Sequence, residues 1–121
     1  MAITAVASPV PAAKVASYQQ FRAALDGTRR AEFEASRRRV GLREYSFAQP
    51  LPDGGYLQIS VWEGDDPAAS LRRMLQAQDE FSRWFVDQVR EIHGTDPDQV
   101  DVAALLPQPP AVAATSQRWT W

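Results

Sequence analysis

The sequence contains no cysteine, one histidine and one lysine among its 121 residues. The absence of cysteine excludes disulfides, a thiolate nucleophile, iron–sulfur clusters and Cys-ligated zinc sites. No apolar run approaches the roughly 18–20 residues that a membrane-spanning helix needs. The first residues also lack the basic start and leucine-rich core of a signal peptide. We therefore expect a cytoplasmic protein that makes no contact with a membrane.

The composition is that of a folded protein. Hydrophobic residues make up 45% of the chain and charged residues 23%, with a formal net charge of −2. Disordered chains instead combine low hydrophobicity with high net charge. The length suits one domain over residues 1–121, with an irregular proline-rich segment near 95–110.

Charge is divided unevenly along the chain. Residues 22–43 hold seven arginines and three acids, whereas residues 53–101 hold eleven acids and four arginines. The run Arg37-Arg38-Arg39 could contact nucleic acid. The acidic balance of the whole chain and the lack of any known nucleic-acid motif argue against such a partner. We expect the basic and acidic regions to complement each other within the fold or across a dimer.

The first half of the chain predicts a strand followed by two helical segments. Residues 3–8 are apolar and tolerate a β conformation, and prolines follow them. Apolar residues then recur at helical spacing over 11–25. Thr28 is a candidate cap for a second helix that runs through Val40. Gly41 is suited to end that helix in the left-handed conformation.

The middle of the chain predicts a β-hairpin. Residues 42–48 and 56–63 alternate between apolar and polar side chains, and a turn cluster with Asp-Gly lies between them at 50–55. The more apolar set of side chains is expected to face the helices. This set consists of Tyr45, Phe47, Leu57, Ile59 and Val61, and the opposite face would present Glu44, Ser46, Tyr56, Gln58, Ser60 and Trp62.

The second half predicts two more helices and a last strand. Asp66 and Pro67 resemble a helix cap and first turn, and a strong apolar stripe over 81–92 ends at Gly94. Residues 112–121 are compatible with a strand. The resulting order βαββαβ matches an α+β, ferredoxin-like fold with an antiparallel sheet and helices on one face. Two such sheets packed face to face would form a dimeric α/β barrel that encloses a pocket.

Three runs resemble sequences of small bacterial proteins of unknown function in the dimeric α/β barrel superfamily. They are GTRRAEFEASRRRVGLRE (27–44), VWEGDDP (61–67) and QDEFSRWFVDQVREIHG (78–94). The resemblance implies the fold, a homodimer and a pocket. The superfamily includes cofactor-free monooxygenases, polyketide cyclases, dehydratases, haem-binding peroxidases and proteins without known chemistry, so the resemblance leaves the reaction open.

Glu44 and His93 are the candidate catalytic residues. A carboxylate that points into the pocket could act as a general base. The structural alternative for Glu44 is an ion pair with Arg29, Arg38 or Arg43. His93 is the one side chain that titrates near neutral pH without perturbation, and its structural alternative is contact with free carbonyls at a helix C-terminus. Haem ligation by His93 has no support in the sequence, and no metal-binding spacing is present.

Six further residues are candidates for substrate binding. Aromatic side chains could stack on a substrate, polar ones could bind its oxygen atoms, and an arginine could hold an acidic group. For the aromatic residues the alternative is packing in a dimer interface. Tyr45 would replace Glu44 in the pocket if the strand register differed by one residue. The six are Arg38, Tyr45, Tyr56, Gln58, Ser60 and Trp62.

These features favour a cofactor-independent enzyme that acts on a hydrophobic or aromatic carbonyl compound. A cyclase, isomerase, dehydratase or monooxygenase of natural-product biosynthesis would fit. The alternative is a dimeric protein that binds a small molecule, or has a structural role, without catalysis.

Overall fold

The computed structural model describes residues 2–94. It contains three strands, a short 3₁₀ helix and four α-helices. In chain order they are β1 (Ala2–Val10), η1 (Ala12–Lys14), α1 (Val15–Asp26), α2 (Arg30–Arg39), β2 (Arg43–Pro50), β3 (Tyr56–Gly64), α3 (Pro67–Gln76) and α4 (Glu80–His93). The last strand predicted at 112–121 lies outside the described residues.

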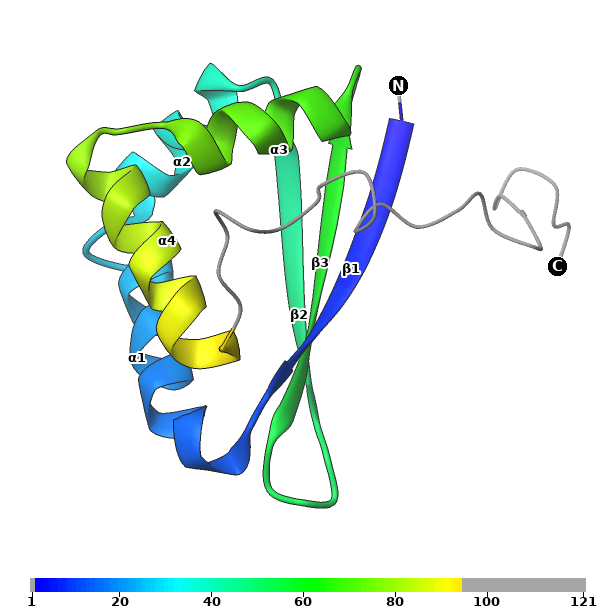
Figure 1. Ribbon diagram of the computed structural model, residues 1–121, viewed down its shortest axis with the longest axis vertical. Coiled ribbons are helices and arrows are strands. Elements are labelled where there is room, and N and C mark those ends of the chain that lie inside the picture. The colour runs from blue at the N-terminus through cyan, green and yellow to red at the C-terminus, as the bar shows by residue number, and fades with distance from the viewer. Residues whose placement is uncertain (1, 95–121) are drawn as a thin grey trace, which may run out of the picture.

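The strands form one antiparallel sheet in the order β1-β3-β2. Strand β3 is central, and it pairs antiparallel with β1 on one side and with β2 on the other. The outer two strands therefore run parallel to each other, and α1 and α2 connect them across the sheet. Figure 1 shows the helices gathered on one side of the sheet. The fold is thus α+β, as predicted.

Local sequence signals explain most element boundaries. The predicted hairpin is confirmed, and Asp53 accepts a hydrogen bond from the Gly55 amide in its turn at 2.8 Å. Asp66 accepts a bond from the Ala69 amide and so caps α3. Gly94 ends α4 with φ near 68°, a left-handed conformation that favours glycine. The predicted cap at Thr28 is wrong, because α2 begins at Arg30 without a side-chain cap.

Two apolar clusters form between the sheet and the helices. One joins Val40, Leu42, Leu71 and Met74 near the start of β2. The other joins Val10, Tyr18, Phe21 and Ile92 near the end of β1. The clusters lie at opposite ends of the sheet, which leaves the stretch between them to other side chains. That stretch holds the candidate site.

The assignment of the sheet faces differs from the sequence prediction. Trp62 packs against the first cluster and Tyr56 against the second, so this set of side chains faces the helices. The opposite, outer face carries exposed apolar side chains, with Ile3, Phe47 and Tyr45 at 66%, 57% and 43% exposed, and the ion pair Arg43–Glu63 at one end. The predicted faces are therefore reversed. The reason is that the helices supply most of the apolar contact themselves, through residues such as Phe21, Leu71, Phe81 and Phe85.

None of the helices in residues 2–94 has the length and apolar character that crossing a bilayer requires.

Candidate functional site

The helix-facing side of the sheet carries an unusual layer of polar side chains. The strand register places Thr4, Trp62 and Glu44 side by side in one row across the three strands. The next row consists of Val6, Ser60 and Ser46. Sheets covered by helices normally turn their apolar side chains toward those helices. A polar layer at this place needs internal hydrogen bonds, because burying an unpaired polar group is costly.

Glu44 is the centre of that hydrogen bonding. Its Oε1 atom accepts bonds from Arg37 Nε at 2.7 Å and from the indole Nε1 of Trp62 at 2.8 Å. The ion pair is enclosed, since the Arg37 and Glu44 side chains are only 6% and 7% exposed. Within residues 2–94 the second oxygen, Oε2, accepts no hydrogen bond. The carboxylate is thus held through one oxygen while the other is available.

Arg37 holds Glu44 from the helical layer. Its guanidinium carbon lies 4.6 Å from the ring centroid of Phe33 and 4.5 Å from that of Phe85, distances typical of cation–π contacts. Nη1 donates to the Ser36 hydroxyl at 3.0 Å. Nη2 is buried and has no hydrogen-bond partner within residues 2–94. Packing on two rings fixes the guanidinium, and with it the carboxylate.

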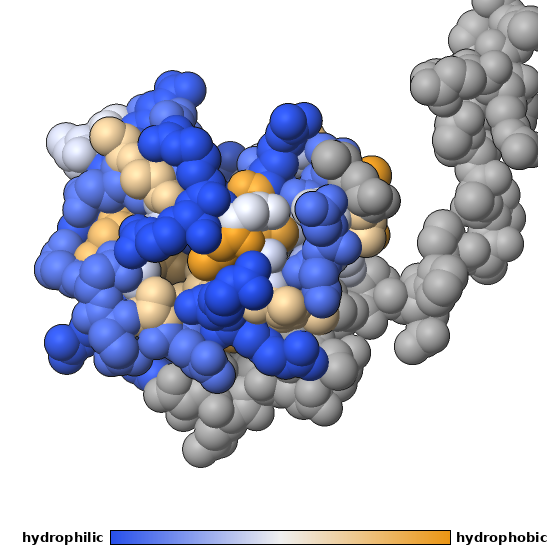
Figure 2. All heavy atoms as spheres, turned by 90° about the horizontal axis from the view of Figure 1, so that it is seen from above, coloured by the Kyte–Doolittle hydropathy of each residue, from blue (hydrophilic) through white to orange (hydrophobic). Residues whose placement is uncertain are grey.

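Two hollows adjoin Glu44. The inner hollow, of about 60 Å³, lies between the sheet and the helices. Its floor includes Ser46 and Gln58 besides Glu44. Its other lining residues come from the helices and are Phe21, Arg22, Leu25, Asp26, Phe33 and Phe85. The outer hollow is larger, about 520 Å³, and opens at the end of the sheet where α2 turns into β2. Figure 2 looks down on that end and shows a small group of hydrophobic residues surrounded by hydrophilic ones.

The structure brings four of the predicted binding residues to the helix-facing side of the sheet. Trp62 contacts Glu44 directly. Gln58 Nε2 donates to the Ser60 hydroxyl at 3.0 Å, and Ser60 is buried. The Tyr56 ring lies 6.0 Å from that of Tyr18, away from the inner hollow and against the second cluster.

Two predicted binding residues lie elsewhere. Tyr45 lies on the outer face of the sheet and is 43% exposed. Glu44, and not Tyr45, therefore faces Arg37, and the alternative register in which Tyr45 replaces Glu44 does not occur. Arg38 is exposed and lines the outer hollow. The partner of Glu44 is Arg37, a residue absent from the three arginines that the sequence suggested.

His93 lies far from Glu44. Its Nδ1 is 2.9 Å from the carbonyl oxygen of Pro9, a residue that pairs with Leu57 at the other end of the sheet. Glu44 pairs with Trp62, and the separation of residues 57 and 62 along an extended strand is about 17 Å. His93 therefore ties the end of α4 to β1, and the structure does not unite the two predicted catalytic residues.

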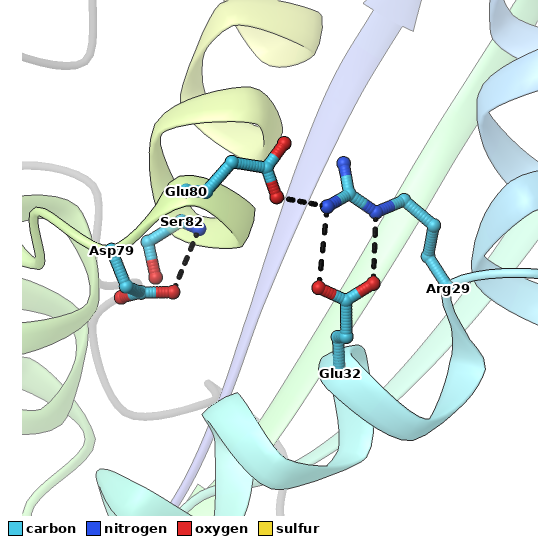
Figure 3. A network of polar contacts seen from close by, with 5 residues as sticks. All are labelled: Arg29, Glu32, Asp79, Glu80 and Ser82. Atoms are coloured by element: carbon cyan, nitrogen blue, oxygen red, sulfur yellow. Dashed lines mark hydrogen bonds and ion pairs between the residues drawn. The ribbon is translucent and has the colours of Figure 1, made fainter.

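Ion pairs within the chain connect the basic region to the acidic region. Arg29 of the basic region donates to Glu32, with both contacts between 3.1 and 3.2 Å, and also pairs with Glu80 at the start of α4 (Figure 3). Hydrogen bonds to Glu32 and then to Glu80 raise the pKa of the Arg29 guanidinium. The same guanidinium lies 4.4 Å from the ring centroid of Trp84. These contacts join the basic and acidic regions within one chain.

Sequence reasoning missed the residues that build the hollows around Glu44. Phe33 and Arg37 are four residues apart, so a helix places them on one face. That spacing was a signal for an aromatic–arginine stack. Phe85 belongs to the apolar stripe of α4, where sequence alone assigns it to the core.

Residues 2–94 contain no group of three or more His, Asp or Glu side chains that could hold a metal ion. Comparisons with known protein families, with curated proteins and with solved structures find no match to this chain.

Proposed function

We propose that the protein is an enzyme that transfers a proton in a small aromatic or hydrophobic carbonyl compound, with Glu44 as the general base. The observation that carries the proposal is the Glu44 carboxylate, which Arg37 and Trp62 hold between the sheet and aromatic walls. Ligand sites in proteins are mostly apolar, with a few polar groups placed to orient the ligand. The inner hollow combines an apolar wall of three phenylalanines and Leu25 with the polar groups of Arg22, Asp26, Glu44, Ser46 and Gln58.

The contacts of Glu44 support a base. Arg37 and Trp62 both donate to Oε1, which holds the carboxylate in place and leaves Oε2 for a substrate proton. Oε2 takes a proton from the carbon next to the carbonyl group, and the C–H electrons move onto the carbonyl oxygen to give an enolate. The hydroxyl of Ser46 and the amide of Gln58 are the groups on the same floor that can donate to that oxygen. Return of the proton to another atom gives an isomer. Where the compound carries a second carbonyl group, the enolate carbon attacks that carbonyl carbon to form the ring bond, and the electrons of its C=O bond give an alkoxide that takes back the proton held on Glu44.

The proposed reaction uses the chain's own side chains and no cofactor. His93 has a positioning role in it, because its contact with Pro9 places α4, and thus Phe85, against the sheet. Arg38 and the other groups of the outer hollow would contact the part of the substrate that extends out of the inner hollow.

Exchange of deuterium into aryl ketones tests the proposal without knowledge of the natural substrate. A panel of aryl methyl ketones and aryl 1,3-diketones in D₂O is followed by proton NMR with and without the protein. We expect faster exchange with the wild type, and loss of the acceleration, by about 100-fold or more, in Glu44→Gln. Glu91→Gln is the matched control, since Glu91 is an exposed carboxylate on α4. Equal acceleration by wild type and Glu44→Gln contradicts the role of Glu44.

A non-catalytic binding protein is the second candidate. The same hollows would serve it, and the buried ion pair of Glu44 with Arg37 favours it, because that pair also has a structural use. Binding of the ketones with no acceleration of exchange by the wild type would select this candidate.

We further propose that the protein is a homodimer through its outer sheet face. Ile3, Tyr45 and Phe47 are exposed there, beside Leu57 and Ile59 of the central strand. An apolar sheet face of this kind usually marks an interaction surface. A second copy packed sheet to sheet would cover it and give the dimeric α/β barrel that the sequence predicts.

The full ferredoxin-like order needs a fourth strand. Within residues 2–94, β1 pairs on one side only, with β3. That free edge is where the arrangement would place the strand predicted at 112–121, which lies outside the described residues.

Sedimentation tests the dimer. Phe47→Asp puts a charge among the exposed apolar side chains of the outer face, on strand β2, and we expect it to convert a micromolar dimer to monomer. Ala48→Asp is the control, because it adds the same charge one residue along the same strand, at an exposed position on the other side of the sheet. A monomeric wild type, or equal effects of the two variants, contradicts the proposed interface.

A further inference from the structure

The two hollows beside Glu44 have Phe33 in common as well. The Phe33 ring is nearly parallel to that of Phe85, at 11° and with centroids 6.3 Å apart. The guanidinium of Arg37 lies 4.6 Å from its centroid. Because a neighbouring ring and a buried cation both pack on it, the ring is fixed in position. Phe33 is therefore an ordered wall between the inner and outer hollows.

The volumes of the two hollows limit the size of the group that could pass Phe33. The inner hollow measures about 60 Å³ and the outer about 520 Å³. A protein cavity that holds benzene measures about 150 Å³. The inner hollow thus admits a hydroxyl group or the edge of a ring. Its other side is lined by Arg22, Leu25 and Asp26 of α1, so a ligand that enters past Phe33 keeps the rest of its atoms in the outer hollow.

We propose that the two hollows are consecutive parts of one ligand site and that Phe33 determines the size of the group that reaches Glu44. The inference rests on the proposed function, and it narrows the substrate class to single-ring carbonyl compounds. Phenol, which resembles the enol form of such a compound, serves as the probe: its hydroxyl donates to Oε2 of Glu44, and its ring lies on the outer side of Phe33. Fused-ring compounds are excluded, because their width meets the Phe33 ring before the hydroxyl reaches the carboxylate.

Binding of phenol and 2-naphthol, measured by calorimetry, tests the inference. We expect the wild type to prefer phenol, and Phe33→Ala to shift the ratio of the two dissociation constants by about 10-fold or more toward 2-naphthol. Phe33→Leu, which keeps more of the side chain, should give a smaller shift in the same direction. The matched control is Phe81→Ala, since Phe81 is a buried aromatic residue that lines neither hollow. A folded Phe33→Ala variant with an unchanged ratio overturns the inference.

A second measurement needs no ligand. The indole N–H of Trp62 bonds to Glu44 behind Phe33, whereas the indole of Trp84 belongs to a ring that packs on Phe81 at 5.6 Å. We expect Phe33→Ala to speed hydrogen exchange at the Trp62 indole relative to Trp84, as seen by NMR. Phe81→Ala should instead speed hydrogen exchange at the Trp84 indole relative to Trp62. Unchanged exchange at Trp62 in Phe33→Ala overturns the inference even if the wild type binds neither probe.

Glu44→Gln separates this inference from the proposed function. If Glu44→Gln binds phenol as the wild type does, Glu44 does not contact the ligand. That result contradicts both the proposed function and the ligand class inferred from it. If phenol binding depends on Glu44 but Phe33→Ala leaves both the ratio and the Trp62 exchange unchanged, only the role of Phe33 fails.

Discussion

The two faces of the sheet differ in a way that is opposite to the usual arrangement. The face under the helices carries Glu44, Ser46, Ser60 and Thr4, whereas the outer face carries exposed Ile3, Tyr45 and Phe47. A free-standing protomer would gain more by the reverse arrangement, since apolar burial is the main stabilising contribution. The comparison shows that the distribution of polar and apolar side chains over the two faces does not maximise the stability of one isolated chain.

The polar face depends on its hydrogen bonds. Ser60 receives a bond from Gln58 and Glu44 receives two, whereas the buried hydroxyl of Thr4 has no hydrogen-bond partner within residues 2–94. The apolar support of this face comes from the two clusters at the ends of the sheet. On the outer face Arg43 donates to Glu63 at 3.4 Å, and neither apolar cluster of residues 2–94 includes a side chain of that face. Changes on the two faces should therefore have different consequences, and four predictions follow in order of expected size.

The largest effect should come from breaking the ion pair of the polar face. Arg37→Ala leaves the Glu44 carboxylate in a nearly buried place without its cation, and we expect a loss of about 3–5 kcal/mol in the free energy of unfolding. Urea denaturation followed by circular dichroism measures it.

The double variant Arg37→Met/Glu44→Leu is the control. It replaces both charges by apolar groups of similar length, and such replacement of a buried pair is often neutral or stabilising. Its stability should approach or exceed that of the wild type, while the ketone exchange activity disappears. Equal losses in the single and double variants would show that packing, rather than charge, holds this face together.

The next prediction compares the stability losses caused by changes at two neighbouring residues on opposite faces of the sheet. Ser60→Val leaves the amide of Gln58 without its acceptor, and we expect a loss of about 1–3 kcal/mol at any protein concentration. Ile59→Thr on the outer face should destabilise more at high protein concentration than at low, because a second copy covers it only in the dimer. Thermal unfolding over a wide concentration range measures both. If Ile59→Thr has the same effect at all concentrations, the outer face is not a dimer interface.

A smaller effect should come from Asp79, which caps α4 on the helical side of the polar face. Its carboxylate accepts a bond from the Ser82 amide at 3.2 Å. Hydrogen bonding from the Ser82 side chain, and then from this amide, with help from Arg39, lowers the pKa of Asp79 below its ordinary value of 3.8. A lowered folded-state pKa means that the stabilisation is present above the unfolded pKa and is lost as the pH falls through the folded value. We expect Asp79→Ala to cost about 1 kcal/mol at pH 7.

Thermal unfolding at several pH values checks the sign. The difference between wild type and Asp79→Ala should shrink as the pH falls below 3.8, the ordinary value of the carboxyl. A difference that grows toward low pH would contradict the cap. Asp87→Ala is a suitable control, since Asp87 lies in the middle of the same helix.

The smallest effect should come from Glu80, the exposed partner of Arg29 (Figure 3). Exposed ion pairs contribute little, and salt screens them. We expect Glu80→Gln to lower the melting temperature slightly at low ionic strength and to have no effect in 1 M salt. The pair Arg37–Glu44 is buried, so the Arg37→Ala loss should persist in the same salt. Equal salt sensitivity of the two variants would remove the contrast between the buried and exposed parts of the charge network.

Much of the fold could be predicted from the sequence, because the signals involved are local. The hairpin follows from alternation around Asp-Gly, the start of α3 from Asp66 and Pro67, and the end of α4 from Gly94. Thr28 had the same kind of signal and was not used, because α1 and α2 are joined by a turn in which Arg29 precedes the helix.

The candidate site could be predicted only in part. Glu44 and Trp62 were expected on one face with Gln58 and Ser60, and the strand register confirms that they share it. The predicted environment of these residues was wrong, because the sequence pattern suggests that the apolar face of a hairpin meets the helices. Arg37 could not be chosen among its neighbouring arginines without the path of α2 over the sheet. The separation of His93 from Glu44 likewise depends on where α4 ends.

The sequence by itself determined which residues alternate along each strand and where most helices begin and end, since these depend on neighbours within a few positions. Only the tertiary structure decided which sheet face the helices cover. That choice depends on the sum of contacts from four helices and three strands at once, and no local pattern contains that sum. It is this choice that encloses Glu44 with Arg37 and leaves Tyr45 and Phe47 at the surface.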